Sequence, residues 1–112
     1  MENCIFCKII EGKIPSPRVY EDENFIVIRD INPLYKVHDL IITKKHIVSV
    51  NEVVESDSQI FCSIFSIAKK IAEIENVSAE GFRLVVNSGK NAGQLVPHFH
   101  MHLLAGEKLR EL

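Results

Sequence analysis

One run of alternating histidine and apolar residues constrains the fold of this 112-residue chain more than any other feature. From residue 98 to residue 104 the run reads His98-Phe99-His100-Met101-His102-Leu103-Leu104. Because successive side chains of a β-strand point to opposite faces, a strand would place the three histidines on one face and Phe99, Met101 and Leu103 on the other. The pattern therefore predicts a strand over residues 96–104 with one buried face and one face of imidazoles.

A polar segment with two glycines, residues 87–94, comes directly before this strand. Imidazole is a nucleophile and a proton carrier near neutral pH, and glycine lets backbone N–H groups approach phosphate oxygens closely. The combination favours a site for an anion that carries a reactive centre. Two other interpretations are a solvated strand face, which more usually holds Lys, Thr or Glu, and a metal site built from histidines at i, i+2 spacing.

The rest of the chain predicts an α+β domain with one short helix, one long helix and four further strands. The short helix is expected over residues 4–12 and the long one over residues 56–75, where isoleucines recur at spacings of three and four. The further strands are expected at residues 19–21, 25–30, 38–43 and 82–87. Short connections favour antiparallel neighbours, so we expect a five-stranded antiparallel sheet.

Several details are predicted for the long helix. Ser56 begins a segment that resembles a capping box, with Gln59 three residues later. Cys62 lies inside the helix and is interpreted as a small buried apolar residue rather than a reactive thiol. Phe61 and Phe65 widen the apolar stripe, which favours burial of this helix in a homodimer.

Composition and charge exclude several classes of function. The formal net charge is −2, which gives no reason to expect binding to nucleic acid or to a membrane surface, and no apolar run approaches the length of a membrane span. The N-terminal residues lack the features of a signal peptide, and three cysteines do not suit a disulfide framework. We therefore expect a cytoplasmic protein with a single domain over residues 1–112.

The histidine run resembles the His-φ-His-φ-His-φ-φ signature of the histidine triad (HIT) superfamily, in which φ is an apolar residue. The resemblance, to the Hint branch, extends over nearly the whole chain and includes, in the expected order, residues 4–10, 20–22, 30–33, 44–46 and 87–94. It implies a HIT-like fold with the helices on one side of the sheet. It also implies a homodimer that forms a continuous sheet, paired through the long helix and the strand after it.

Cys4 and Cys7 have the C-x-x-C spacing that lets two sulfurs reach one tetrahedral metal ion. The resemblance implies His46 and His98 as the remaining ligands, and a closed Cys2His2 set is typical of a structural zinc site. The alternative is a pair of ordinary thiols. If His98 binds zinc, the other two histidines of the run remain for chemistry.

The resemblance assigns the catalytic chemistry to the second histidine of the run. His100 is then the nucleophile that attacks the α-phosphorus of a nucleotide and forms a nucleotidyl-histidine intermediate, which water cleaves. His102 and Asn87 match positions that contact phosphate oxygens. Gly93 and Gln94 match the loop that presents backbone N–H groups to the phosphate.

The resemblance also implies a nucleoside pocket. Asp30 matches an acid that hydrogen-bonds the ribose hydroxyls, as suits a carboxylate that faces a cis-diol. The apolar residues that match the wall around the base, with plain core as the alternative, are Phe6, Ile9, Ile14, Ile28 and Ile31. His38 matches a histidine that orients groups or relays protons near the triad, and a turn histidine before a strand is its alternative.

Leu95 departs from the eukaryotic Hint pattern, in which a serine at this place is aimed at the leaving group. The resemblance implies a purine nucleotide-binding hydrolase that acts at the α-phosphate, with nucleoside phosphoramidates as the favoured substrates. One alternative is a dinucleoside polyphosphate hydrolase, although that branch usually carries glutamine where this chain has His102. The other is a nucleotide-binding regulatory or interaction module with slow, incidental hydrolysis.

Overall fold

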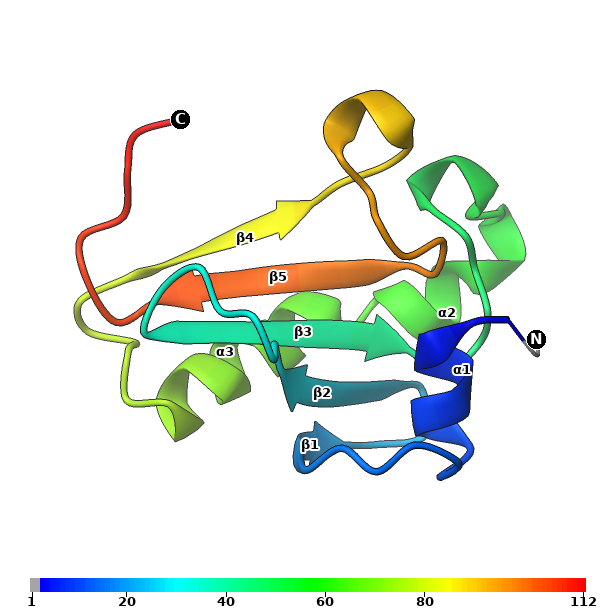
Figure 1. Ribbon diagram of the computed structural model, residues 1–112, viewed down its shortest axis with the longest axis horizontal. Helices are drawn as coiled ribbons and strands as arrows, with labels where there is room; N and C mark the ends of the chain where they lie inside the picture. Colours follow the sequence, from blue (N-terminus) through cyan, green and yellow to red (C-terminus); the bar gives the residue numbers. More distant parts are fainter. Residues whose placement is uncertain (1–2) are drawn as a thin grey trace.

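The centre of the molecule is one antiparallel sheet of five strands in the spatial order β1-β2-β3-β5-β4 (Figure 1). The strands, in a computed structural model that describes residues 3–112, are β1 Arg18–Glu21, β2 Phe25–Arg29, β3 Val37–Thr43, β4 Phe82–Val86 and β5 His100–Ala105. All four pairs of neighbouring strands are antiparallel. The predicted fold class is therefore confirmed.

Helices cover both faces of this sheet (Figure 1). They are α1 Ile5–Ile10, α2 Ser58–Phe61 and α3 Ile64–Ile74. Because neighbouring residues of a strand point to opposite faces, Val27 and Ile41 pack with α3, while Ile26 and Ile42 pack with α1. The resemblance implied helices on one side only, and that expectation is wrong for α1, which packs on the face that carries the histidines.

β2 and β3 are buried on both faces because of these two layers. Phe25, Ile26 and Val27 are fully buried, and so are Ile41 and Ile42. Burial of an apolar side chain of this size stabilises a fold by roughly 1.5–3 kcal/mol, so the two central strands hold the sheet in place for the site. Among residues 3–112, no helix is both long enough and apolar enough to cross a membrane.

The histidine run forms β5 from His100 onward, so the strand begins later than predicted. The predicted alternation of faces is nevertheless present along the run. Phe99, Met101 and Leu103 belong to the core on the α3 face. The histidines point to the other face, where α1 packs against the sheet.

The long helix predicted over residues 56–75 is wrong in its continuity. The segment contains a 3-10 turn at Glu55–Asp57, followed by α2 and α3, which are separated at residues 62 and 63. The side chain of Asp57, rather than that of Ser56, stabilises the beginning of this helical segment. One carboxylate oxygen of Asp57 accepts the N–H of Val54 at 3.0 Å, and the other lies 2.6 Å from Nζ of Lys45. A buried carboxylate with a charged partner outcompetes a serine hydroxyl as the anchor.

The interruption between α2 and α3 changes the surroundings of the side chains near it. Cys62 is exposed, so the prediction that it is buried is wrong. Phe61 packs inside its own chain, with its ring centroid 6.3 Å from that of Phe25 and 4.9 Å from that of Phe99. Phe65 is 69% exposed. Of the two phenylalanines, Phe65 is therefore the more accessible to another molecule.

Candidate active site and metal centre

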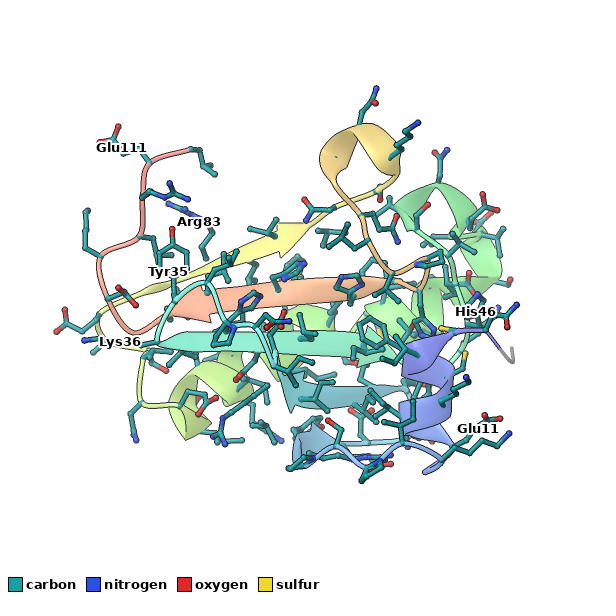
Figure 2. The ribbon with its side chains drawn as sticks, viewed as in Figure 1. Glu11, Tyr35, Lys36, His46, Arg83 and Glu111 are labelled. Atoms are coloured by element: carbon teal, nitrogen blue, oxygen red, sulfur yellow. The ribbon has the colours of Figure 1, made fainter. Side chains whose placement is uncertain are left out.

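Two cysteines and two histidines converge beside α1, where Figure 2 labels His46. Sγ of Cys4 lies 3.3 Å from Nδ1 of His98, and Sγ of Cys7 lies 3.2 Å from Nδ1 of His46. The two Nδ1 atoms are 3.1 Å apart, and all four ligand atoms lie within 4.8 Å of one another. Zinc bonds of about 2.0–2.3 Å in a tetrahedron place ligands roughly 3.3–3.8 Å apart, so this group could hold a metal ion.

The hydrogen bonds of His98 leave the appropriate nitrogen for a metal ion. Nε2 of His98 lies 2.6 Å from the carbonyl oxygen of Thr43, and a carbonyl only accepts, so Nε2 carries the proton. Nδ1, which faces the two sulfurs, keeps its lone pair. An outer hydrogen bond of this kind is typical of metal-bound histidine. Burial, with the neighbouring Cys4 adding to it, raises the pKa of the Cys7 thiol to about 11.

The short helix α1 explains why the two sulfurs meet. Cys4 is its N-cap residue, and Sγ of Cys4 accepts the backbone N–H of Cys7 at 3.4 Å. Phe6 lies between the two cysteines in sequence. Its ring centroid is 5.8 Å from that of His98 and 5.1 Å from that of His100, edge-on in both cases. The helix that carries the cysteines therefore also contacts the central histidine of the triad.

His100 is held with one ring nitrogen free. Its Nδ1 lies 2.8 Å from the carbonyl oxygen of His98, so Nδ1 carries the proton and Nε2 keeps its lone pair. The ring is only 9% exposed and packs edge-on against Phe6 and His102. In this tautomer the neutral imidazole can act as a nucleophile without first losing a proton.

Two further hydrogen bonds determine the tautomers of His38 and His102. The backbone N–H of Leu34 donates to Nδ1 of His38 at 3.0 Å, so the proton of the neutral ring is on Nε2. Nε2 of His38 then donates to Nδ1 of His102 at 2.9 Å. The proton of His102 is therefore on its own Nε2, where it can be donated to an anionic ligand.

Both rings of this pair are neutral near pH 7. Burial, with smaller contributions from the imidazoles of His100 and His38, lowers the pKa of His102 to about 4. Burial also lowers the pKa of His38, against the opposing effect of Asp30, whose Oδ2 lies 3.4 Å from Nε2 of His38. The site therefore offers hydrogen-bond donors and a nucleophile rather than imidazolium acids.

Asp30, His38 and His102 also lie close enough together to hold a metal ion. The hydrogen bonds of this second group oppose that use. A metal ion on Nε2 of His38 would require the proton on Nδ1, but Nδ1 already accepts the N–H of Leu34. This group is therefore better described as a hydrogen-bonded relay, and the cysteine-containing group is the one whose donors suit a metal.

The loop before β5 uses the backbone of two predicted site residues for its own shape. The N–H of Gly93 donates to the carbonyl of Lys90, and the N–H of Gln94 donates to the carbonyl of Gly89. The side-chain amide of Gln94 accepts the N–H of Gly89 and donates to two backbone carbonyls. Gly93 has a φ of +83°, which favours glycine. Gly93 and Gln94 thus hold the loop together from within.

Other groups of this loop are available to a ligand. Asn87 directly follows β4 and is half-buried, and the side chain of Leu95 is 91% exposed. Within residues 3–112, neither the side-chain amide of Asn87 nor the backbone N–H of Leu95 has a hydrogen-bond partner. Both groups are donors of the kind that phosphate oxygens accept.

The structure brings four of the five predicted wall residues together on the α1 face. One apolar cluster contains Phe6, Ile9, Ile14 and Ile28. Ile31 is 88% exposed and lies outside this cluster. Asp30 is half-buried near the relay, and its Oδ1 accepts the N–H of Asn32 at 2.9 Å. The structure thus groups four of the predicted wall residues and leaves the fifth, Ile31, exposed on the surface.

Sequence reasoning missed two residues that act through backbone atoms. Leu34 donates its N–H to His38, and Thr43 accepts from His98 through its carbonyl oxygen. Every non-proline residue has these groups, so no side-chain pattern could have selected them. The only available signal was position, since Leu34 lies four residues before His38 and Thr43 is the last residue of β3.

Comparison with known proteins identifies the family of this chain. The family model described as HIT domain matches residues 11–109. The purine nucleoside phosphoramidase of Escherichia coli K12 is 43% identical over 108 residues, which cover 96% of this chain and 91% of that protein. A HIT family hydrolase from Clostridium thermocellum superimposes with a TM-score of 0.96 and 48% identity over 100% of this chain and 97% of its own. The chain therefore belongs to the HIT family, as its histidine run predicted.

Proposed function

We propose that this protein hydrolyses purine nucleotide conjugates at the α-phosphate, with nucleoside phosphoramidates as its favoured substrates. The observation that carries the proposal is the tautomer of His100, whose free Nε2 lies in the same cluster of rings as the N–H of His102. The similarity to the phosphoramidase of E. coli covers nearly the whole chain and supports the same chemistry.

In the first step of the proposed mechanism, Nε2 of His100 attacks the α-phosphorus. A bond from phosphorus to Nε2 forms, and the bond from phosphorus to the leaving nitrogen breaks. The carbonyl of His98 still accepts Nδ1–H and stabilises the positive charge that the substituted ring acquires. The side chain of Leu95 has no proton to donate, so the leaving amine takes its proton from solvent. Water then attacks phosphorus and releases a proton to solvent, the bond from phosphorus to Nε2 breaks, and Nε2 recovers its lone pair.

Neutral donors would bind the phosphate oxygens in this mechanism. They are Nε2–H of His102, the side-chain amide of Asn87 and the backbone N–H of Leu95, while Gly93 and Gln94 keep the loop in shape. Donors held in place before the substrate arrives stabilise developing charge without a cost of reorganisation. In this proposal, the phosphate-binding role that the resemblance gives to the loop belongs to the backbone N–H of Leu95, next to the side-chain amide of Asn87.

The nucleoside would bind beside this phosphate site. Asp30 would accept the ribose hydroxyls, and Phe6, Ile9, Ile14 and Ile28 would form the wall around the base. These wall residues are apolar and offer no side-chain donor or acceptor to a base. We therefore propose that the pocket discriminates weakly between adenine and guanine.

Turnover of an adenosine phosphoramidate by wild type and by His100→Ala tests the proposed activity. We expect the variant to lose at least about a thousandfold in rate and to form no nucleotidyl adduct detectable by mass spectrometry. Its affinity for AMP should change by about tenfold or less in calorimetry, because one contact of several is removed. Cys62→Ser, on the other face of the sheet, is the control and should keep the full rate.

Two results would contradict the proposed activity. Retention of more than about a hundredth of the wild-type rate by His100→Ala would refute the covalent mechanism. Faster turnover of a dinucleoside polyphosphate than of the phosphoramidate would favour the alternative hydrolase instead.

We also propose that Cys4, Cys7, His46 and His98 hold one structural zinc ion. All four ligand positions come from the protein, so the ion would fix α1, and with it Phe6, against His100 without contacting substrate. Free thiols are typical of a reducing compartment, so the three free cysteines support the predicted cytoplasmic location.

Metal analysis tests the zinc proposal with a matched pair of cysteine variants. Cys7→Ser should lose the metal and melt at a lower temperature, whereas Cys62→Ser, at an exposed cysteine, should keep both properties. Less than about a tenth of an equivalent of zinc in protein purified without chelator, together with a melting curve that chelation does not change, would refute the site.

The protein is further proposed to form a homodimer through α3 and β4. β4 is an edge strand, and both it and α3 expose apolar side chains, namely Phe65, Phe82 and Val86. Phe65→Glu should convert the dimer to a monomer in light scattering, because its carboxylate would be buried without a partner. Phe61 is unsuited to this test since it packs inside its own chain. A wild-type mass near 12.7 kDa at micromolar concentration would contradict the dimer.

A further inference from the structure

The C-terminal tail, residues 106–112, contacts the connection between β2 and β3 at two points and β4 at one. Oε2 of Glu107 accepts the backbone N–H of Lys36 at 2.7 Å, and the hydroxyl oxygen of Tyr35 accepts the backbone N–H of Arg110 at 3.3 Å. Arg83 of β4 donates to the carbonyl oxygen of Arg110 at 2.8 Å. Figure 2 labels Tyr35, Lys36 and Arg83 at the end of the sheet over which the tail passes.

Gly106 brings the tail into direct contact with the start of β3. Its φ is +93°, and a Cβ built there would lie 2.9 Å from Cβ of Lys36 and 3.1 Å from the backbone nitrogen of Val37. Only glycine allows so close an approach. Residues 106–109 of the tail also line a cavity of about 580 Å³, together with Asn76 and Glu80. Contacts with residues 35–37 and with Arg83 therefore hold the tail in place.

The same connection supplies the N–H that determines the tautomer of His38. The side chain of Leu34 is 73% exposed, so it contributes little to holding its own backbone in place. The N–H of Leu34 nevertheless meets Nδ1 of His38 at 3.0 Å. The residues that follow Leu34 directly are the two that the tail contacts, Tyr35 and Lys36.

We propose that Glu107 is a positioning residue for the pair of His38 and His102. By accepting the N–H of Lys36, Glu107 holds the connection so that Leu34 donates to Nδ1 of His38. His38 then keeps its proton on Nε2, and His102 keeps its proton on the nitrogen assigned to the phosphate. This inference rests on the proposed function for its effect on catalysis, but the two tautomers exist and can be measured without any turnover.

Release of the connection would allow the polarity of the relay to reverse, against the carboxylate of Asp30, whose Oδ2 lies 3.4 Å from Nε2 of His38. Without the N–H of Leu34, His38 can carry its proton on Nδ1, and its Nε2 then accepts from Nδ1–H of His102. Nε2 of His102 would then present a lone pair to a phosphate oxygen instead of a proton. Ground-state binding through the nucleoside would persist, while stabilisation of the transition state would weaken.

Three variants and two measurements test this proposal. In protein labelled with 15N-histidine, long-range proton–nitrogen spectra distinguish Nδ1–H from Nε2–H, and wild type should show Nε2–H for both rings. Glu107→Ala should populate the other tautomer and lower kcat by about three- to tenfold with KM within about twofold, as loss of one supporting hydrogen bond predicts. Glu107→Gln retains an acceptor oxygen and should restore both properties. The control is Glu111→Ala, because Glu111 extends away from the sheet (Figure 2).

Each remaining outcome is decisive. If Glu107→Ala keeps the wild-type tautomers, the positioning role is refuted whatever the rate. If Glu107→Gln behaves like Glu107→Ala, the acceptor argument is refuted, because glutamine can accept the same N–H. If the tautomers change while kcat does not, Glu107 is a positioning residue, and the proposed contact of His102 with phosphate is what fails.

Discussion

Asp39 is a buried acid whose replacement should stabilise the protein at neutral pH. It lies on β3 with no exposed surface, and within residues 3–112 neither of its carboxylate oxygens has a hydrogen-bond partner. Burial, followed by the nearby carboxylate of Glu75, raises the pKa of Asp39 to about 8. Arg29 opposes this shift only in part, because its guanidinium is engaged by Glu75 at 2.9 and 3.2 Å. Asp39 is therefore protonated in the folded protein at pH 7.

The sign of the resulting pH dependence follows from proton binding. In the unfolded chain Asp39 ionises near pH 4, while in the folded protein it keeps its proton up to about pH 8. Between these values the folded state binds more protons, so this residue lowers the free energy of unfolding as pH rises, and its effect levels off above about pH 8. At about 1.4 kcal/mol for each pH unit, the free energy of unfolding lost between about pH 4 and pH 7 is about 4 kcal/mol. Because Glu75 shares the interaction, we expect about 2–4 kcal/mol.

Asp39→Asn tests this expectation because asparagine has nearly the same shape and cannot ionise. Its side-chain N–H can also donate to the carboxylate of Glu75. Urea unfolding of both proteins at pH 5, 7 and 8.5, with metal and protein concentrations held constant, should show the variant gaining stability over wild type as pH rises. The difference between the two proteins, rather than either curve alone, removes the pH dependence of other groups.

A matched variant separates the two causes of the raised pKa. Glu75→Gln removes the neighbouring charge but leaves Asp39 buried, so the difference between aspartate and asparagine should become smaller and keep its sign. A stability difference between wild type and Asp39→Asn that is the same at pH 5 and pH 8.5 would refute the argument.

Three further substitutions give shorter tests. Leu95→Ser places a hydroxyl in the exposed loop and should raise turnover of phosphoramidates by about tenfold in steady-state kinetics, because it supplies the leaving amine with a nearby proton. Phe61→Ala should lower the free energy of unfolding by about 3 kcal/mol in urea, since its ring packs against those of Phe25 and Phe99. Gly106→Ala should lower the melting temperature, because alanine is strained at a φ of +93° and its Cβ would meet Lys36.

The strands were predictable because their signal is local. Alternation along the histidine run predicts Phe99, Met101 and Leu103 in the core, and the structure confirms all three, although the strand itself begins at His100. A similar local pattern led to a wrong prediction for the long helix. Isoleucines at spacings of three and four describe a continuous helix and a broken one equally well, so the interruption at Cys62 left no trace in that pattern. The environment of the interruption is formed by tertiary contacts, since Phe61 packs against rings from distant parts of the chain.

The candidate site shows the same limit at the scale of single atoms. The sequence identifies His98, His100 and His38 as residues of interest, but it does not indicate which nitrogen of each ring carries the proton. That choice depends on backbone partners, because a carbonyl oxygen places the proton on the nitrogen that faces it, whereas an N–H places it on the other one. Thr43 and His98 supply carbonyls to His98 and His100, respectively, and Leu34 supplies an N–H to His38. Three identical side chains thus become a metal ligand, a nucleophile and a relay in this proposal because three different backbone groups face them.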